Sequence, residues 1–231
     1  MRDAVYEGMA RHVAVHWWFV GRRRILEAAL EALDLSANAR ILEVGAGRGG
    51  NIPLLRCFGR VTALEPNPKA RAWITAKTGI SAVDCTLPNT TPLRDSHFDL
   101  IAMLDLLEHS EDATSALANL ASPLAPGGRF LITATVAAAG LKVSLIRYFN
   151  TLLFPAVAAS RLALNLSRNR SVDEEGLPPS PINELLAALC AAERHFVLAL
   201  PMPFGVSLLA VLEAKTDEPV KQALNARDRP T

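Results

Sequence analysis

The stretch Ile41–Asn51, with the sequence ILEVGAGRGGN, is the part of the chain that decides its fold. Residues 40–44 read as a short apolar strand that runs directly into the glycines. Glycine lets the backbone turn sharply and lets a ligand approach it closely. A strand followed by such a turn and then by a helix, whose first amide groups are free, is typical of a ligand-binding α/β sheet.

The alternation of strands and helices continues on both sides of this stretch. Because strands that alternate with helices favour a parallel sheet covered on both faces, we predict an α/β fold with a Rossmann-like, doubly wound and mostly parallel sheet. Such sheets bind ligands at the carboxyl ends of their strands. The predicted strands cover residues 40–44, 60–64, 80–83, 98–103, 129–136 and 204–214, with a turn at 124–128, and the predicted helices cover 4–34, 51–58, 68–77, 111–120, 149–166 and 181–196.

The glycines by themselves do not identify the ligand. Gly45, Gly47 and Gly50 fit the G-x-G-x-x-G pattern of dinucleotide-binding proteins. Glu65 follows the second predicted strand, and its carboxylate could accept hydrogen bonds from the ribose hydroxyls of several nucleotide cofactors. An NAD(P)-dependent oxidoreductase is therefore one alternative at this point.

Glu43 and two later stretches favour another ligand. A carboxylate does not help to bind a pyrophosphate, because both groups are negatively charged, whereas it attracts the protonated amine of a sulfonium amino acid. The spacing from Glu43 to Gly49, E-x-G-x-G-x-G, resembles the S-adenosylmethionine loop of class I methyltransferases. FDLIAMLDLLEHSED at 98–112 and LAPGGRFLI at 124–132 resemble two further motifs of that family in the same order. Residues 40–136 are thus similar to class I S-adenosylmethionine-dependent methyltransferases, of the kind called type 11.

This resemblance implies the class I methyltransferase sheet, S-adenosylmethionine as the cofactor, and methyl transfer to a small-molecule or lipid-linked acceptor. It also implies a part in cofactor binding for residues at the ends of the predicted strands. These are Glu43 for the methionyl amine, Gly45, Ala46 and Gly47 for the methionine part, Glu65 for the ribose, Pro66, Asp84 and Cys85 for the adenine, and Leu104 for the reacting side.

His109 is the candidate catalytic base. It follows Asp105 and Glu108 within one helical turn, and some quinone O-methyltransferases carry a similar group of two acids and a histidine. Three readings are open: a structural or capping role, proton transfer, and a metal site. The structural role is favoured and no metal is predicted, because the Glu-His pair is common in relatives with or without a metal.

The resemblance extends beyond the cofactor-binding part. HWWFVGRRRIL at 16–26, YFNTLLFP at 148–155 and LPPSPIN at 177–183 are similar to a bacterial subgroup of these methyltransferases. Trp17, Trp18 and Phe19 form either a lid over the site or the apolar face of the first helix. The arginines at 22–24 form either a phosphate site or a solvated helix face.

The connection after the fifth predicted strand is shorter than the family leads us to expect. A parallel return usually needs a dozen or more residues, and here only residues 136–140 are available before Leu141. AAAGLKV at 137–143 resembles the end of the family's crossover helix plus the start of its sixth strand. We therefore expect 141–146 to pair differently or to form a loop or helix. A relative that binds the cofactor but is catalytically defective is the alternative function.

The predicted organisation is one methyltransferase-like domain over residues 1–214. It consists of an N-terminal helical lid at 1–38, a cofactor-binding half at 39–136 and a truncated acceptor-side half at 137–214, with a flexible tail at 215–231. The apolar stretch 141–166 carries a few basic residues and could contact a membrane surface peripherally.

Charge and cysteine content limit the partners. The formal net charge of +1 gives no general attraction to nucleic acid, so no nucleic-acid partner is expected. The three cysteines, Cys57, Cys85 and Cys190, are widely spaced, which speaks against a zinc site or a disulfide framework. With no apolar signal core at the N-terminus, a cytoplasmic location is expected.

Overall fold

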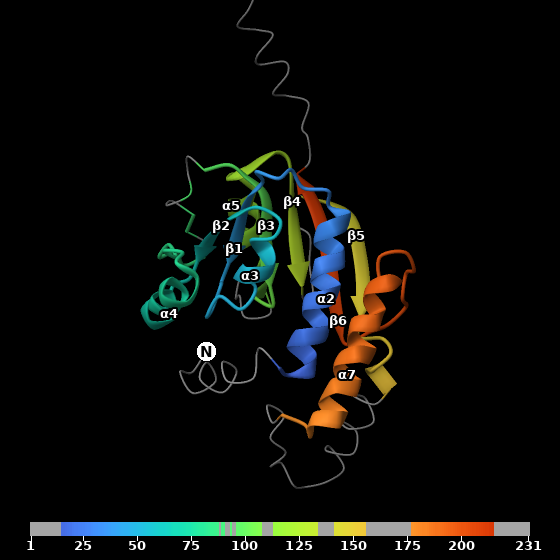
Figure 1. Cartoon of the computed structure of the whole chain (residues 1–231). Coiled ribbons are helices and arrows are strands. Elements are labelled where there is room, and N and C mark those ends of the chain that lie inside the picture. Colours follow the sequence, from blue (N-terminus) through green and yellow to red (C-terminus); the bar gives the residue numbers. More distant parts are fainter. Residues whose placement is uncertain are drawn as a thin grey trace, which may run out of the picture.

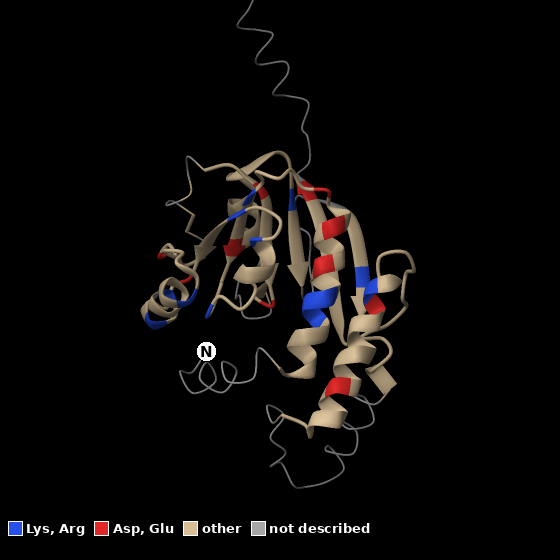
Figure 2. Ribbon diagram, viewed as in Figure 1, with Lys and Arg blue, Asp and Glu red and all other residues tan. Residues whose placement is uncertain are grey.

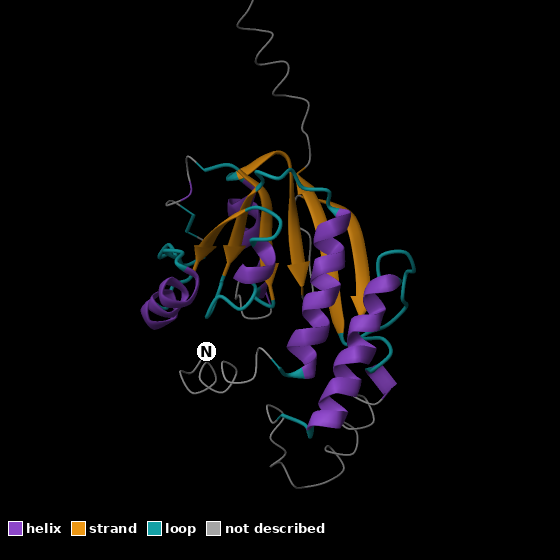
Figure 3. Cartoon of the chain, viewed as in Figure 1, coloured by secondary structure: helices purple, strands orange, loops and turns teal. Residues whose placement is uncertain are grey.

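A six-stranded sheet lies at the centre of the molecule. The computed structural model describes residues 15–87, 89–90, 93, 96–107, 113–133, 141–155 and 177–214 of the chain. The strand order is β2-β1-β3-β4-β6-β5, and helices lie on both faces of the sheet (Figures 1 and 3). This is the α/β architecture that the alternating pattern predicts.

The cofactor-binding half folds as the sequence indicates. Four strands run parallel, and β1 lies between β2 and β3. Both flanks of β1 are therefore paired, which fits its nearly continuous burial. The elements are β1 (Arg40–Val44), α3 (Ile52–Leu55), β2 (Arg60–Leu64), α4 (Pro68–Thr78), β3 (Phe98–Leu104), α5 (Ala113–Ala121) and β4 (Leu124–Thr133).

Two local predictions in this half are wrong. Residues 80–83 form no strand, and only Val83 makes an isolated parallel bridge, to Leu64. The predicted turn at 124–128 belongs to β4, whose pairing with β3 shifts register between Phe98 and Leu100. Gly127 has a positive φ of 77° within this irregular start, so the Pro-Gly-Gly signal bends the strand without ending it.

The last two strands take the places that the methyltransferase sheet assigns to its sixth and seventh strands. β6 (Ser207–Ala214) is antiparallel both to β4 and to β5 (Leu141–Phe149). Consequently β4 and β5 run parallel to each other with β6 between them. The expectation that 141–146 would pair differently or form no strand is wrong, although β5 is irregular, with a register shift between Val143 and Leu145. The predicted helix at 149–166 is wrong at its start, because Phe149 is the last residue of β5, and its part from 156 onward lies outside the described residues.

The short connection does not prevent this arrangement, because the ends that it joins are close enough. Thr133 pairs with Leu209 and Leu141 pairs with Ala214. With about 3.3 Å of rise per residue and about 4.8 Å between strands, the two ends are roughly 20 Å apart. A chain reaches about 3.3 Å per residue when extended, so the residues between them suffice in length. The path of 134–140 lies outside the described residues.

Helices α2 (Trp17–Ala32) and α7 (Ser180–Ala192) pack side by side over β4, β6 and β5 (Figure 1). Asn183 of α7 accepts a hydrogen bond from Trp17 N at 2.8 Å and donates one to Val15 O at 2.7 Å. It thereby supplies an acceptor to a free amide at the start of α2. The Trp18 ring stacks on Phe149 at 6.2 Å between centroids. The motif at 16–26 thus contacts both of the other outlying motifs, at 148–155 and at 177–183.

Gly21 lies where α2 packs against α7, next to Cys190. A Cβ atom there would come within 2.4 Å of Cys190 Cβ, so this position accepts only glycine without a shift of the helices. The helix continues through Gly21 without a break. Of the predicted helix 4–34, residues 17–32 form α2, residues 15–16 and 33–34 are not helical, and residues 4–14 lie outside the described part. α7 begins at Ser180, one residue before the predicted start, and a short 3-10 helix at Glu193–His195 follows it.

Two apolar cores lie on the opposite faces of the sheet. One is formed by α2 and α7 with side chains of the strands, and includes Ile25, Leu30 and Phe149. The other packs α5 on the remaining face, with Leu117 and Phe130 fully buried. Among the described residues, no helix has the length and apolar character needed to cross a bilayer.

Candidate functional site

The glycine loop occupies the carboxyl end of β1. Gly45, Gly47 and Gly49 have positive φ values of 69°, 56° and 75°, which L-residues with side chains rarely adopt. At Gly45 a Cβ atom would also lie 2.6 Å from Leu106 Cδ1. The loop is held next to β2 by a hydrogen bond from Ala46 N to Leu64 O at 2.9 Å. The predicted loop residues therefore form one tight turn at the rim of the sheet.

Glu43 is buried in β1 directly below this turn, with 1% of its surface exposed. Asn51 Nδ2 donates a hydrogen bond to its Oε1 atom at 3.0 Å, whereas its Oε2 atom has no partner although it is buried. Burial raises the pKa of the Glu43 carboxyl to about 7, the charge of Glu65 adds to this, and the Asn51 hydrogen bond and Arg22 act against it. An unpaired buried acceptor fits a cationic donor such as the amine of S-adenosylmethionine.

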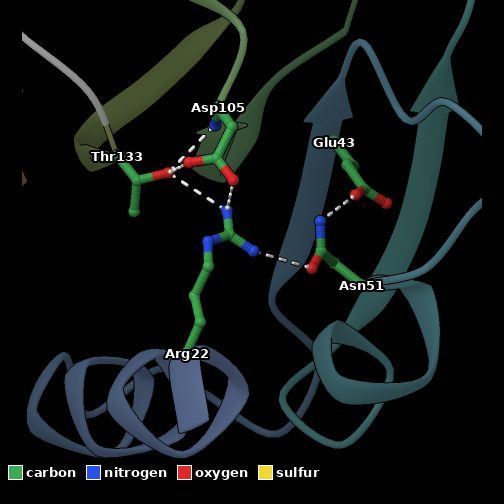
Figure 4. Close-up of polar contacts among 5 residues, drawn as sticks. All are labelled: Arg22, Glu43, Asn51, Asp105 and Thr133. Atoms are coloured by element: carbon green, nitrogen blue, oxygen red, sulfur yellow. Dashed lines mark hydrogen bonds and ion pairs between the residues drawn. The ribbon is translucent and has the colours of Figure 1, made fainter. Parts of the chain in front are cut away.

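Arg22 reaches this region from helix α2, and its side chain is only 4% exposed (Figure 4). Its Nη2 atom lies 2.9 Å from Asp105 Oδ2 and donates to Thr133 Oγ1 at 3.1 Å. Thr133 in turn donates to Asp105 Oδ1 at 2.7 Å and accepts from Asp105 N at 2.9 Å. The Nη1 atom of Arg22 donates to Asn51 Oδ1 at 3.4 Å, and the Nε atom of Arg22 is buried without a partner.

Asp105 has an unusual backbone conformation, with a φ of 56°. Its amide and both of its carboxylate oxygens are bonded to Arg22 or Thr133, and these contacts hold it in this sparsely populated region. Through Asn51, the ion pair is connected to Glu43. One polar network therefore joins helix α2 to the ends of β1, β3 and β4.

Glu65 lies at the end of β2, as predicted, but its carboxylate is already bonded by the backbone. Gly47 N donates to its Oε2 atom at 2.7 Å, and Asn67 N donates to Oε1 at 2.9 Å. Each carboxylate oxygen can accept a second hydrogen bond, so a pair of ribose hydroxyls fits this group chemically. The side chain is 2% exposed, however, and the Gly47 contact closes the glycine loop over it.

The residues expected around the adenine are gathered by Arg71 of α4. Its Nη2 atom lies 3.0 Å from Asp84 Oδ2, and its Nη1 atom donates to the carbonyl oxygens of Glu65 and Pro66 at 2.9 and 2.7 Å. Cys85 is buried, and its thiol donates to Asn89 O at 2.9 Å. Burial and, to a lesser degree, the charge of Asp84 raise the pKa of this thiol, which fits a structural role.

The residues on the reacting side are only partly described. Leu104 is buried at the end of β3, paired with Thr133 of β4. Glu108 and His109 lie outside the described residues, so the proton-transfer and metal readings of this group stay open. Within the described ranges, no cluster of three or more His, Cys, Asp or Glu side chains suits a metal ion.

Sequence reasoning missed several members of the network. Arg22 was expected on a solvated face or at a phosphate, and it is the buried partner of Asp105; Arg24 is exposed and pairs with Glu27 at 2.9 Å. Figure 2 shows these arginines as a blue band on α2. Because three arginines follow one another at 22–24, the sequence alone does not show which of them faces inward. The buried neighbours Gly21 and Ile25 were the signal that could have found it, since they lie on the same helix face.

A shallow depression of about 520 Å³ lies elsewhere, between α2 and α7. It is lined by Arg24, Ala188, Ala191, Ala192, Arg194 and His195. None of these residues comes from the carboxyl end of a strand, where open α/β sheets bind their ligands. The polar network at the strand ends is therefore the candidate site.

The comparison of sequences agrees with this location. Residues 42–132 match the sequence profile of a family described as a methyltransferase domain. The matched range begins within β1 and ends within β4, so it contains the glycine loop, Glu43, Glu65 and Asp105. No curated protein matches the chain in sequence.

Solved structures share the fold at low sequence identity. One is a complex between the Trm112 methyltransferase activator of Haloferax volcanii and a candidate methyltransferase, with 17% identity over 92% of this chain and 94% of that one and a TM-score of 0.56. Another is a TehB-like S-adenosylmethionine-dependent methyltransferase from Corynebacterium glutamicum, with 17% identity over 93% of this chain and 100% of that one and a TM-score of 0.52. These similarities extend over β5 and β6 as well as the cofactor-binding half.

Proposed function

This chain contains a class I S-adenosylmethionine-dependent methyltransferase domain, and on that premise we propose that it methylates a small-molecule or lipid-linked acceptor. The cofactor is S-adenosylmethionine. The proposal concerns the acceptor, the turnover and the residues that hold the cofactor. A nicotinamide-dependent oxidoreductase has no comparable support.

The observation that carries the proposal is the unpaired Oε2 atom of Glu43. A buried carboxylate oxygen without a donor is costly, and a protonated amine supplies the missing donor. The atom lies under a glycine turn at the end of β1, which is where this fold binds its ligand. A pyrophosphate at the same place would face a carboxylate and be repelled.

In this proposal the chain mainly binds and orients. When bound, S-adenosylmethionine supplies a methyl group on a positively charged sulfur, which leaves as a neutral thioether. Glu43 accepts hydrogen bonds from the methionyl amine, Glu65 accepts them from the ribose, and Leu104 lines the reacting side and excludes water. Such positioning is the main contribution that a direct displacement requires.

Exposed apolar side chains support a lipid-linked acceptor among the possible ones. Ile146, Tyr148, Leu152 and Phe154 follow one another along β5 and its exit, and each is more than a third exposed. The Phe204 ring contacts the Phe154 ring in a tilted arrangement, at 5.2 Å between centroids. An apolar surface of this kind fits lipid chains or a membrane surface, as proposed for 141–166.

A second candidate function is cofactor binding with little or no turnover. It is favoured by the short connection between β4 and β5, which leaves few residues in a region that would contribute to an acceptor pocket. A location in the cytoplasm is proposed for either function.

Isothermal titration calorimetry with S-adenosylmethionine and with NAD tests the shared part of both candidates. We expect binding of the first and none of the second, and the reverse result would overturn the proposal. Formation of S-adenosylhomocysteine is then followed with fractionated polar and lipid extracts. Formation with a lipid fraction alone supports the lipid-linked acceptor, and absence of product with every fraction supports the second candidate.

A further inference from the structure

Asn51 bridges two buried side chains of opposite charge. Its Nδ2 atom donates to Glu43 Oε1 at 3.0 Å, and its Oδ1 atom accepts from Arg22 Nη1 at 3.4 Å (Figure 4). This orientation of the carboxamide is the one that both neighbours permit, since a carboxylate requires a donor and a guanidinium requires an acceptor. The amide therefore presents a donor to the acid and an acceptor to the base.

An α-amino acid head group has the same polarity. Its ammonium is a donor and its carboxylate is an acceptor, and the two are separated by a single carbon atom. Placed between Glu43 and Arg22, it would make the same two contacts as Asn51 with full charges in place of an amide dipole. The hydrogen bonds of Asn51 have one charged partner each, whereas those of the head group have two and add the attraction between opposite unit charges in a buried environment, so the head group would compete well with the side chain.

The Arg22 guanidinium has hydrogen-bond donors available for an anion next to Asn51. Asp105 and Thr133 hold its Nη2 atom, which leaves Nη1 with only the long contact to Asn51 and Nε with no partner. The guanidinium is only 4% exposed and is fixed at the end nearest Asp105. It thus has donors to spare in a buried environment, where a carboxylate would be bound strongly.

We infer that Arg22 binds the α-carboxylate of S-adenosylmethionine and that Asn51 holds the place of the methionyl head group until the cofactor displaces it. The ammonium replaces Asn51 Nδ2 on Glu43 Oε1, and a second of its three N–H groups donates to the unpaired Oε2 atom. The carboxylate replaces Asn51 Oδ1 on Arg22. This inference rests on the proposed function and adds to it a binding residue from helix α2. It also explains why a buried arginine of α2 is joined to the glycine-loop side of the sheet.

The test is a calorimetric series with three ligands on the folded wild-type chain and its variants. S-adenosylmethionine has both charged groups of the head, decarboxylated S-adenosylmethionine lacks only the carboxylate, and 5′-methylthioadenosine lacks both. We expect Arg22→Met to weaken S-adenosylmethionine binding by about tenfold to a hundredfold and to leave the affinities for the other two ligands within about twofold. Glu43→Gln should weaken the first two ligands and spare 5′-methylthioadenosine.

Asn51→Ala is the matched variant, because it removes the bridge and keeps both charges. It should bind S-adenosylmethionine at least as tightly as the wild type, whereas a loss of affinity would show that Asn51 is itself a ligand and would overturn the inference. Equal affinity of wild-type protein for S-adenosylmethionine and its decarboxylated form would also overturn it, and this comparison needs no variant. If the wild type binds none of the three ligands, the proposed function itself is wrong.

Discussion

Arg22 Nη2 of helix α2 lies 2.9 Å from Asp105 Oδ2 at the end of β3, and this ion pair joins two segments that are far apart in the sequence. The arginine side chain is 4% exposed and the aspartate side chain 39%. Removing the carboxylate charge leaves a buried guanidinium without its counter-ion, which costs more than the loss of an exposed pair. The pair is therefore expected to contribute measurably to stability.

Asp105→Asn should lower the free energy of unfolding by about 1–3 kcal/mol, less than for a fully buried pair because the aspartate is partly solvated. Arg22→Met combined with Asp105→Asn should cost less than the sum of the two single changes. Urea denaturation of the four proteins measures this coupling. Glu27→Gln, which removes the exposed pair with Arg24, is the control and should cost under about 0.5 kcal/mol. Equal costs for Asp105→Asn and Glu27→Gln would contradict the prediction.

Glu43→Gln should stabilise the cofactor-free protein at alkaline pH. Burial raises the folded-state pKa of Glu43 to about 7 from 4.5, so its favourable contribution is present below pH 4.5 and is lost as the pH rises through 7. The loss amounts to roughly 3 kcal/mol, at about 1.4 kcal/mol for each pKa unit. Glutamine keeps the acceptor for Asn51 and does not ionise.

Denaturation of wild type and Glu43→Gln at pH 5 and pH 8.5 checks this. The stability advantage of the variant should grow between the two pH values, and Glu31→Gln, on the exposed surface of α2, should show no such growth. A constant difference between wild type and Glu43→Gln would mean that Glu43 does not titrate in this range.

The affinity for S-adenosylmethionine should rise with pH in the acidic range. The ammonium needs an ionised Glu43, and a carboxyl with a pKa of about 7 is mostly protonated at pH 5.5. The dissociation constant should therefore fall about tenfold between pH 5.5 and pH 7. Calorimetry in buffers of different ionisation enthalpy should also register a released proton. 5′-Methylthioadenosine has no ammonium, so a similar pH dependence for this ligand would assign the effect to another group.

Gly21→Ala should destabilise the protein, although alanine usually favours a helix over glycine by about 1 kcal/mol. The added Cβ atom would meet both Cβ and Sγ of Cys190 at 2.4 Å, where α2 and α7 are packed together. Overpacking of this kind costs about 1–3 kcal/mol. Thermal unfolding followed by circular dichroism measures the change. A higher melting temperature for Gly21→Ala would show that the two helices separate easily.

The local elements of the cofactor-binding half could be predicted because their signals are short in range. The apolar residues of β1 run into glycines, which adopt the positive φ values of the turn without strain. Asn67 and Pro68 mark the start of α4, where the Asn67 side chain accepts from Lys69 N and Ala70 N. The prediction of a strand at 80–83 was wrong for the opposite reason. Whether a short apolar segment pairs as a strand depends on the backbone beside it in space, which the local sequence does not fix.

Local patterns of residues therefore suffice to predict the sheet class, the glycine turn and the acids at the strand ends, since each depends on neighbouring residues. Packing between distant segments was needed to place Arg22 inward, to put Asn51 between it and Glu43, and to add 141–149 to the sheet edge. These depend on contacts such as the one between Arg22 and Thr133, 111 residues apart. Local preference cannot fix such pairs, because the energy that selects them arises only when distant segments pack and exclude water.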